Sequence, residues 1–251
     1  YSEEKFIIYG SGAAQEMHRR WFEKFLPKDG VKYKNRSDDF HGIAISGPNS
    51  RKLLSRICRD DVSAEALKFR DTRETFVGGV PAILNRISFS GELGYEIYVA
   101  PQFHLKLFEE IEVNGKDLGL KLYGSRALMS LRLEKNWGVW TLDFRPDFTA
   151  LESGLDAFIN WDKNFVGKEA ALNEKKQGPN KKLVTMTVDT KDIDVTNDEA
   201  ILKDNKCVGY VTSGGYAHHV KKSMALGYVP LEFSKHETIL DIEINGIFYK
   251  A

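Results

Sequence analysis

The chain has 251 residues, which suits one large or two small domains and is enough to bury a core without disulfides. Its 36 basic and 36 acidic side chains give a formal net charge of zero, which argues against a nucleic-acid binder that works by neutralising phosphates. No apolar run approaches the length of a membrane span, and hydrophobic residues make up 42%, so we expect a soluble globular protein. The only two cysteines, Cys58 and Cys207, form no CxxC motif, which favours a reducing compartment, the cytoplasm or, in a eukaryote, the mitochondrial matrix.

The chain begins with an apolar run at residues 6–9, which predicts a short strand, and continues with a helix predicted over residues 13–25 by the spacing of its apolar residues. The intervening Gly10-Ser11-Gly12 could form a phosphate-binding loop. It lacks the second half of either nucleotide fingerprint, so we expect a tight turn. Because the sequence starts without Met and within an expected strand, we expect that upstream sequence is missing.

The middle of the chain alternates predicted strands and helices without the regular spacing of a doubly wound fold, which favours the α+β class. A helix is predicted to begin at Ser50, capped by Asn49 or by Ser50 itself. The other elements predicted here are strands at 43–45, 76–84 and 87–98 and helices at 103–111 and 123–136.

The last third of the chain predicts a small antiparallel β-barrel, because short apolar runs alternate with turns. The polar residues 173–182 are typical of a solvated linker, and Asn245-Gly246 is typical of a hairpin turn. The predicted strands cover residues 183–188, 199–202, 207–211, 224–229 and 238–248. We therefore expect one domain over residues 1–178 and a C-terminal barrel over residues 179–251.

Residues 86–99, which read RISFSGELGYEIYV, are the most informative stretch. The alternation of a strand places Glu96 and Tyr98 on one face and Tyr95, Ile97 and Val99 on the other. A buried carboxylate needs hydrogen-bond donors, and the amidine-like edge of a pterin or purine would supply two. The alternative is an exposed Glu96 beside a hairpin.

This stretch resembles the signature of the tetrahydrofolate-binding aminomethyltransferase family. That family includes the glycine cleavage T-protein and the C-terminal folate domains of dimethylglycine and sarcosine dehydrogenases. Further blocks resemble the family in the same order: GSRALMSLRLEK at 124–135, PDFTALESGL at 146–155 with FVGKEA at 165–170, and VGYVTSGGY at 208–216 with ALGYV at 225–229. The resemblance implies an aminomethyltransferase-like folate-binding domain followed by a small antiparallel β-barrel, with tetrahydrofolate as cofactor.

The resemblance also implies roles for individual residues. Glu96 matches the carboxylate that binds the pterin, and Phe89 stands where the family usually has a Tyr, which puts a polar role for that position in doubt. Tyr98 could stack on or flank the ring. Arg126 matches an Arg that helps to hold the folate, and its guanidinium suits the carboxylates of the glutamyl tail. The alternative for Arg126, at the start of a helix, is an ordinary surface residue.

The family's catalytic Asp matches a segment upstream of Tyr1, so we assign no catalytic residue in this chain. The pairs Asp38-Asp39 and Asp60-Asp61 lie in polar turns and match the wrong blocks.

The histidine pair His218-His219 and the residues Trp140 and Asp143 are further candidates for a role in the site. His218-His219 resembles a metal pair, but neighbouring strand residues point to opposite faces and no third ligand is in view, so we expect no metal. We expect Trp140 and Asp143 to line the central opening, with core packing as the alternative for Trp140.

The sequence therefore favours the folate domain of a dimethylglycine- or sarcosine-oxidising enzyme. A Gly-Gly-Tyr turn followed by His, together with the WGVW stretch at 137–140, favours that branch of the family. Two alternatives stay open: a stand-alone aminomethyltransferase of the T-protein type and a non-catalytic folate-binding protein. The expected partners are a small one-carbon donor and a flavin-dehydrogenase domain upstream, with no nucleic acid and no membrane.

Overall fold

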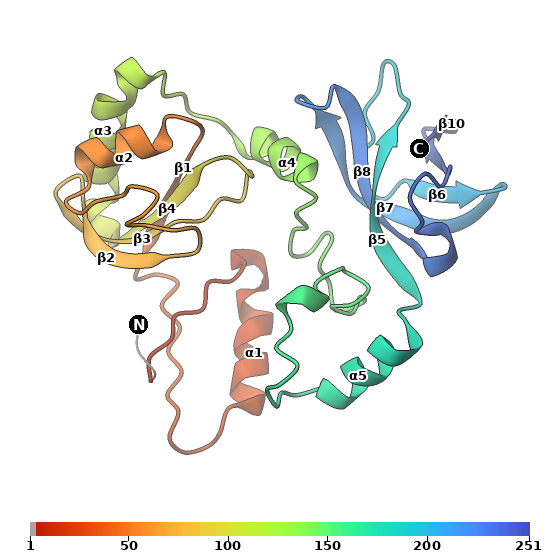
Figure 1. The fold of residues 1–251 in the computed structure, drawn as a ribbon, viewed down its shortest axis with the longest axis horizontal. Coiled ribbons are helices and arrows are strands. Elements are labelled where there is room, and N and C mark those ends of the chain that lie inside the picture. The colour runs from red at the N-terminus through yellow and green to blue at the C-terminus, as the bar shows by residue number, and fades with distance from the viewer. Residues whose placement is uncertain (1–3) are drawn as a thin grey trace. The chain divides into compact units, whose positions relative to one another are not determined.

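The computed structural model describes residues 4–251, and the chain divides into two compact units, residues 1–128 and residues 129–251 (Figure 1). Helix α4 (Ser125–Glu134) begins in the first unit and ends in the second. No helix in this described part of the chain is long and apolar enough to cross a membrane.

The first unit is built on a four-stranded antiparallel sheet with the strand order β1-β4-β3-β2, drawn in orange to yellow in Figure 1. Its strands are β1 (His41–Ser46), β2 (Thr72–Val77), β3 (Val80–Asn85) and β4 (Gly94–Val99). Its complete α-helices are α1 (Gln15–Phe25), α2 (Ser50–Ile57) and α3 (His104–Gly115), and short 3-10 turns cover Gly12–Ala14, Pro101–Phe103 and Lys116–Leu118.

One face of this sheet forms the core of the first unit. Tyr95, Ile97 and Val99 of β4 are buried there with Leu54 of α2 and Leu107 of α3. The predicted alternation along β4 is therefore confirmed, and Glu96 and Tyr98 lie half-buried on the opposite face. Burying one face of a sheet fixes its register, because a one-residue slip would turn the core residues toward solvent.

Several predicted elements of the first unit are wrong. Residues 6–9 form no strand in the described part of the chain, and the strand predicted over 87–98 begins only at Gly94. The single strand predicted over 76–84 is a hairpin, because Gly78 and Gly79 adopt φ values of 59° and 76° and join Val77 directly to Val80. Two consecutive positive φ angles define the tight turn that suits hairpins, and glycine adopts them without steric cost.

The predicted helix α2 is confirmed with Asn49 at its N-cap position, but neither predicted side chain caps it, since the Ser50 hydroxyl donates to the Leu93 carbonyl oxygen. The Asn49 side chain makes no capping hydrogen bond to the helix. Its Nδ2 donates to the Leu118 carbonyl oxygen over 3.0 Å, so Asn49 links the start of α2 to the segment after α3.

The second unit contains a six-stranded antiparallel sheet with the order β10-β9-β6-β7-β8-β5, so the predicted β-rich C-terminal region is confirmed. Its strands are β5 (Lys181–Val188), β6 (Ala200–Lys203), β7 (Lys206–Ala217), β8 (Lys222–Pro230), β9 (Asp241–Ile244) and β10 (Ile247–Lys250). The predicted linker at 173–182 is wrong in its first half, because α5 (Lys168–Gln177) continues to Gln177. The domain boundary expected between residues 178 and 179 stays a prediction.

Candidate functional site

Glu96 lies in the middle of the sheet of the first unit, on the face opposite the core. The β-sheet register places it between Ala44 of β1 and Asn85 of β3. Directly opposite residues in antiparallel strands share a face, with Cβ atoms about 4.5–5.5 Å apart. Asn85 in turn pairs with Thr72 of β2, so a row of four side chains crosses the sheet through Glu96.

Tyr98 holds the Glu96 carboxylate. Its hydroxyl donates a hydrogen bond to Glu96 Oε2 over 2.7 Å. Burial, and after it the hydrogen bond to Glu96, raise the pKa of Tyr98 above its ordinary value. The phenol therefore stays protonated at neutral pH and acts as a donor. A carboxylate offers about four acceptor positions, of which this bond occupies one.

Two residues from outside β4 hold the Tyr98 ring in place. The ring of Tyr9 packs against it with the centroids 4.9 Å apart. On the neighbouring strand, a Cβ added to Gly42 would lie 2.9 Å from Tyr98 Cε1, which is closer than real Cβ contacts come. Glycine at position 42 thus leaves room for the Tyr98 ring beside β1. The sequence pattern identified neither residue, although the aromatic residue in the 6–9 run was a usable signal for Tyr9.

Asn85 carries an unsatisfied polar atom beside Glu96. The residue is only 7% exposed, and its Oδ1 is buried without a hydrogen-bond partner in the described part of the structure. Such atoms are rare in folded proteins, because the lost hydration is not replaced.

The other two predicted site residues are not joined to this pair. Phe89 lies half-buried in the bend before β4, and no ring contact among the described residues links it to Tyr98. Arg126 lies in the first turn of α4 and is exposed, and no hydrogen bond or ion pair within residues 4–251 links it to Glu96. The structure therefore brings together Glu96 and Tyr98 from the predicted set, with Tyr9, Gly42 and Asn85 as additions.

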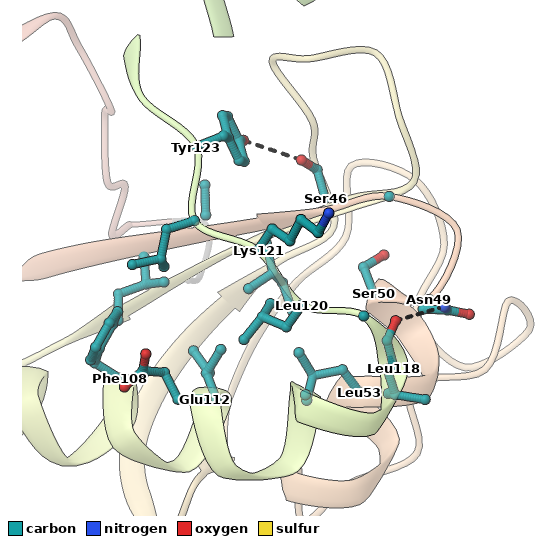
Figure 2. A pocket seen from close by; sticks show the side chains of 18 of the residues that line it. Ser46, Asn49, Ser50, Leu53, Phe108, Glu112, Leu118, Leu120, Lys121 and Tyr123 are labelled. Atoms are coloured by element: carbon teal, nitrogen blue, oxygen red, sulfur yellow. Dashed lines mark hydrogen bonds between the residues drawn. The ribbon is translucent and has the colours of Figure 1, made fainter. Parts of the chain in front are cut away.

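A separate cavity of about 620 Å³ opens at the end of β1, between α2, α3 and residues 118–128 (Figure 2). Leu53, Phe108 and Leu120 supply apolar walls. At its rim the hydroxyls of Ser46 and Tyr123 lie 3.1 Å apart in a hydrogen bond. None of the predicted site residues lines this cavity, although Ala44, the neighbour of Glu96, does.

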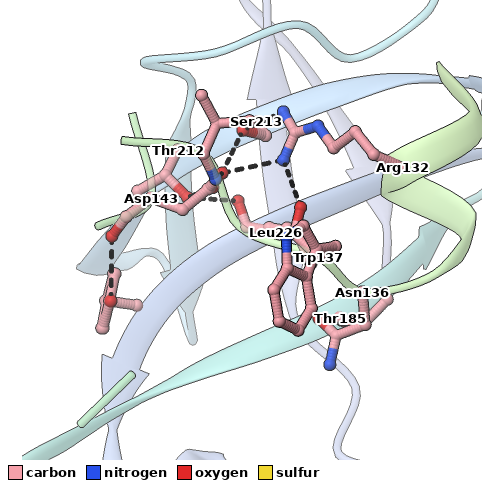
Figure 3. Close-up of polar contacts among 10 residues, drawn as sticks. Arg132, Asn136, Trp137, Asp143, Thr185, Thr212, Ser213 and Leu226 are labelled. Atoms are coloured by element: carbon pink, nitrogen blue, oxygen red, sulfur yellow. Dashed lines mark hydrogen bonds and ion pairs between the residues drawn. The ribbon is translucent and has the colours of Figure 1, made fainter. Parts of the chain in front are cut away.

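In the second unit, Arg132 and Asp143 form a buried ion pair (Figure 3), with side chains only 2% and 0% exposed. Arg132 Nη1 donates to Asp143 Oδ2 over 2.8 Å. The same carboxylate accepts hydrogen bonds from the Val139 amide, the Thr212 hydroxyl and the Ser213 hydroxyl. Burial lowers the pKa of Arg132, and the neighbouring carboxylate opposes that shift.

The Asp143 network corrects one expectation. Asp143 was expected to line a central opening, but it is fully buried and its carboxylate is saturated with donors, so it holds the fold rather than a ligand. The alternative for Trp140, core packing, is also wrong, because Trp140 is 45% exposed and meets the ring of Phe144 edge-on. Sequence reasoning missed Arg132 as a structural residue, although it belongs to the SLRLE block.

The structure shows no group of three or more His, Cys, Asp or Glu residues within residues 4–251 that could hold a metal ion. His218 and His219 are exposed in the turn after β7, and the His219 amide donates to Glu134 Oε1 over 2.8 Å. The Asp39 carboxylate is engaged by Arg36 and that of Asp61 by Ser63. Cys58 and Cys207 are both free thiols.

Comparison with known proteins identifies the family. The model of the GCVT N-terminal domain matches residues 1–163, and that of the glycine cleavage T-protein C-terminal barrel domain matches residues 181–251. The chain belongs to the glycine cleavage T-protein family. This confirms the family resemblance seen in the sequence and the expected α+β fold with its C-terminal barrel domain.

The similar proteins include dimethylglycine dehydrogenases and aminomethyltransferases. The mitochondrial dimethylglycine dehydrogenase of Homo sapiens is 35% identical over 253 residues, which cover 99% of this chain and 29% of that protein. The aminomethyltransferase of Desulfitobacterium hafniense (strain Y51) is 31% identical over 253 residues, covering 100% of this chain and 68% of that protein. The chain thus spans less than a third of the first relative and about two thirds of the second.

A solved structure supports the fold. The glycine cleavage system aminomethyltransferase T from Bartonella henselae superposes with a TM-score of 0.75 at 24% sequence identity, covering 84% of this chain and 57% of that one. The sheet that carries Glu96 therefore belongs to an aminomethyltransferase fold.

Proposed function

We propose that this chain binds tetrahydrofolate through Glu96 and takes part in one-carbon transfer, as the folate domain of a dimethylglycine- or sarcosine-oxidising enzyme. The observation that carries the proposal is the Glu96 carboxylate, held by the Tyr98 hydroxyl on the face of the sheet opposite the core, within the stretch that resembles the family signature. The alternative, an exposed strand Glu, does not account for a half-buried carboxylate with a dedicated donor.

The acceptor positions of Glu96 suit the pterin edge. A pterin presents a ring N–H and an amino N–H side by side, and a carboxylate accepts both at once. Tyr98 takes only one acceptor position and leaves the rest for such an edge. We assign Tyr98 and Phe89 to flank the ring, and Arg126 to pair with a carboxylate of the glutamyl tail, where its exposure suits a flexible, solvated group.

Tetrahydrofolate, when bound, supplies the N5 and N10 nitrogens that accept the one-carbon unit. The contribution of this chain is to fix the ring so that these nitrogens meet the donor in one orientation, and to exclude water around it. No described residue is assigned as general base.

The second candidate is a stand-alone aminomethyltransferase of the T-protein type. The observation that favours it is the 31% identity to a bacterial aminomethyltransferase of which the chain covers 68%. The first candidate predicts a flavin-binding domain in the full-length protein and a methylated glycine as donor. Flavin absorbance of the purified full-length protein separates the two. The proposed compartment is the cytoplasm or, in a eukaryote, the mitochondrial matrix; the Homo sapiens relative is named as a mitochondrial protein.

Titration calorimetry with tetrahydrofolate tests the proposal. Wild type is expected to bind. Glu96→Gln is expected to lose about 10- to 100-fold in affinity, because an amide offers one acceptor oxygen and turns an N–H donor toward the ligand's own donors. Glu92→Gln is the matched control, since Glu92 lies exposed four residues earlier in the same stretch. Unchanged binding by Glu96→Gln refutes the pterin assignment, and binding without transfer by the full-length protein leaves a non-catalytic folate-binding protein.

A further inference from the structure

Asn85 Oδ1 is a hydrogen-bond acceptor that the fold leaves unused. The side chain is 93% buried, since 7% is exposed, and no described residue donates to this oxygen. A buried amide oxygen without a donor has lost its hydrogen bonds to water and gained none in the protein, which costs folding free energy. A valine or leucine would fill the same position on the strand at no such cost, so the polar side chain calls for a ligand that donates to it.

The orphaned oxygen belongs to the same surface as Glu96. Asn85 on β3 and Glu96 on β4 are direct partners in the antiparallel register, so their side chains leave the sheet on the same face. The next pair on this face, toward the C-terminal end of β4, is Ile83 and Tyr98. Tyr98 is the residue that donates to Glu96. Asn85 thus flanks the Glu96 carboxylate on the side away from β1.

The nearest cation in sequence does not satisfy this oxygen. The Arg86 guanidinium lies over the Tyr95 ring, with its carbon 5.1 Å from the ring centroid, and Tyr95 belongs to the core face of the sheet. Arg86 Nη1 donates instead to the Gly94 carbonyl oxygen over 2.9 Å. Since Asn85 and Glu96 share the face opposite the core, a donor to Asn85 Oδ1 would come from the side of the sheet that carries Glu96.

We propose that Asn85 is a second anchoring residue for the pterin ring, whose Oδ1 accepts the amino N–H that Glu96 leaves free. This inference rests on the proposed function. A carboxylate that takes the ring N–H and one amino hydrogen leaves the other amino hydrogen pointing along the same edge of the ring. The neighbouring position in the row across the sheet is occupied by Asn85. Glu96 and Asn85 would then each accept one hydrogen of the 2-amino group, so the site would favour ligands that carry this group.

Calorimetry on the full chain with two ligands tests this role. The ligands are tetrahydrofolate and its analogue with a methyl group in place of the 2-amino group. Asn85→Leu is expected to bind tetrahydrofolate about tenfold more weakly than wild type. Loss of the 2-amino group is expected to weaken binding to wild type by a larger factor than binding to Asn85→Leu. Thr72→Val is the matched control, because Thr72 lies in the same row but one strand further from Glu96.

Stability separates a binding role from a structural one. Asn85→Leu is expected to unfold at the same or a higher urea concentration than wild type, since it removes an unsatisfied buried group. Should leucine prevent folding, Asn85→Ala serves in its place, with the same pair of ligands.

Each outcome decides the inference. If wild type does not bind tetrahydrofolate, the proposed function fails and the role of Asn85 fails with it. If wild type binds and Glu96→Gln is weakened, but the Asn85 variant binds like wild type, the role of Asn85 alone is overturned. The role of Asn85 is also overturned if removal of the 2-amino group lowers the affinity of the Asn85 variant by the same factor as that of wild type. The Asn85 side chain and the 2-amino group are then not coupled.

Discussion

Replacing Asp143 by Asn tests whether the buried network holds the second unit together. Four donors converge on this carboxylate, from Arg132, Val139, Thr212 and Ser213. The amide oxygen of Asn can serve only some of them, and its N–H groups face the other donors. The change also leaves the Arg132 guanidinium, 2% exposed, without a counter-charge. Breaking a buried ion pair at one partner costs about 3–5 kcal/mol, a large part of a typical folding free energy.

The free energy of unfolding is measured by urea denaturation, followed by tryptophan fluorescence. Trp137 is a local reporter, because its carbonyl oxygen accepts from Arg132 Nη1 over 3.1 Å. The matched control is Asp147→Asn, which removes the exposed Asp147 carboxylate from its pair with the half-buried Arg145 and is expected to cost less than about 1 kcal/mol. A loss for Asp143→Asn no larger than that of the control would refute the reasoning.

Two further predictions concern Gly42, beside the hydrogen-bonded Glu96 and Tyr98, and Tyr228, whose hydroxyl donates to the Asp143 carbonyl oxygen. Gly42→Ala is expected to weaken tetrahydrofolate binding several-fold, because the added Cβ would lie 2.9 Å from the Tyr98 ring and displace the hydroxyl that holds Glu96. Gly12→Ala, where the Cβ meets open space, is the control, and equal affinities in both variants would contradict the prediction. Burial raises the pKa of Tyr228 to about 12 from an ordinary value of 10.0. The folded state favours the neutral phenol of Tyr228. The contribution of Tyr228 to the free energy of unfolding is therefore complete below pH 10 and is lost as the pH rises toward 12. Urea denaturation across this range should show a smaller fall for Tyr228→Phe, and an equal fall would rule out the assignment.

The parts of the fold that repeat with a fixed period were predictable from the sequence. The helix at 125–134 and the two faces of β4 follow from apolar spacing alone, because burial of one face requires it. The hairpin at Gly78 and Gly79 was not predicted, because apolar residues stand on both sides of the turn and resemble one continuous strand.

The polar interior was less predictable, because its partners are far apart in the chain. Thr212 and Ser213 reach Asp143 across 69 and 70 positions, and nothing in the local sequence marks any of them as buried. Glu96 was found through its signature, whereas Asn85 became visible only when the register placed it opposite Glu96. A single sequence contains no direct record of such pairings.

The hydrogen bond from Tyr98 to Glu96 has a consequence for the ligands that this site would turn away. The Glu96 carboxylate accepts a hydrogen bond from Tyr98, and the positions that remain on its oxygens are acceptors too, so everything it offers to a ring is an acceptor. A heterocycle with a carbonyl oxygen in place of the pterin amino group would bring that oxygen against a carboxylate oxygen of Glu96, and both atoms are acceptors. Rejection of such rings requires no steric obstacle and no movement of the chain, since electrostatic repulsion alone supplies it.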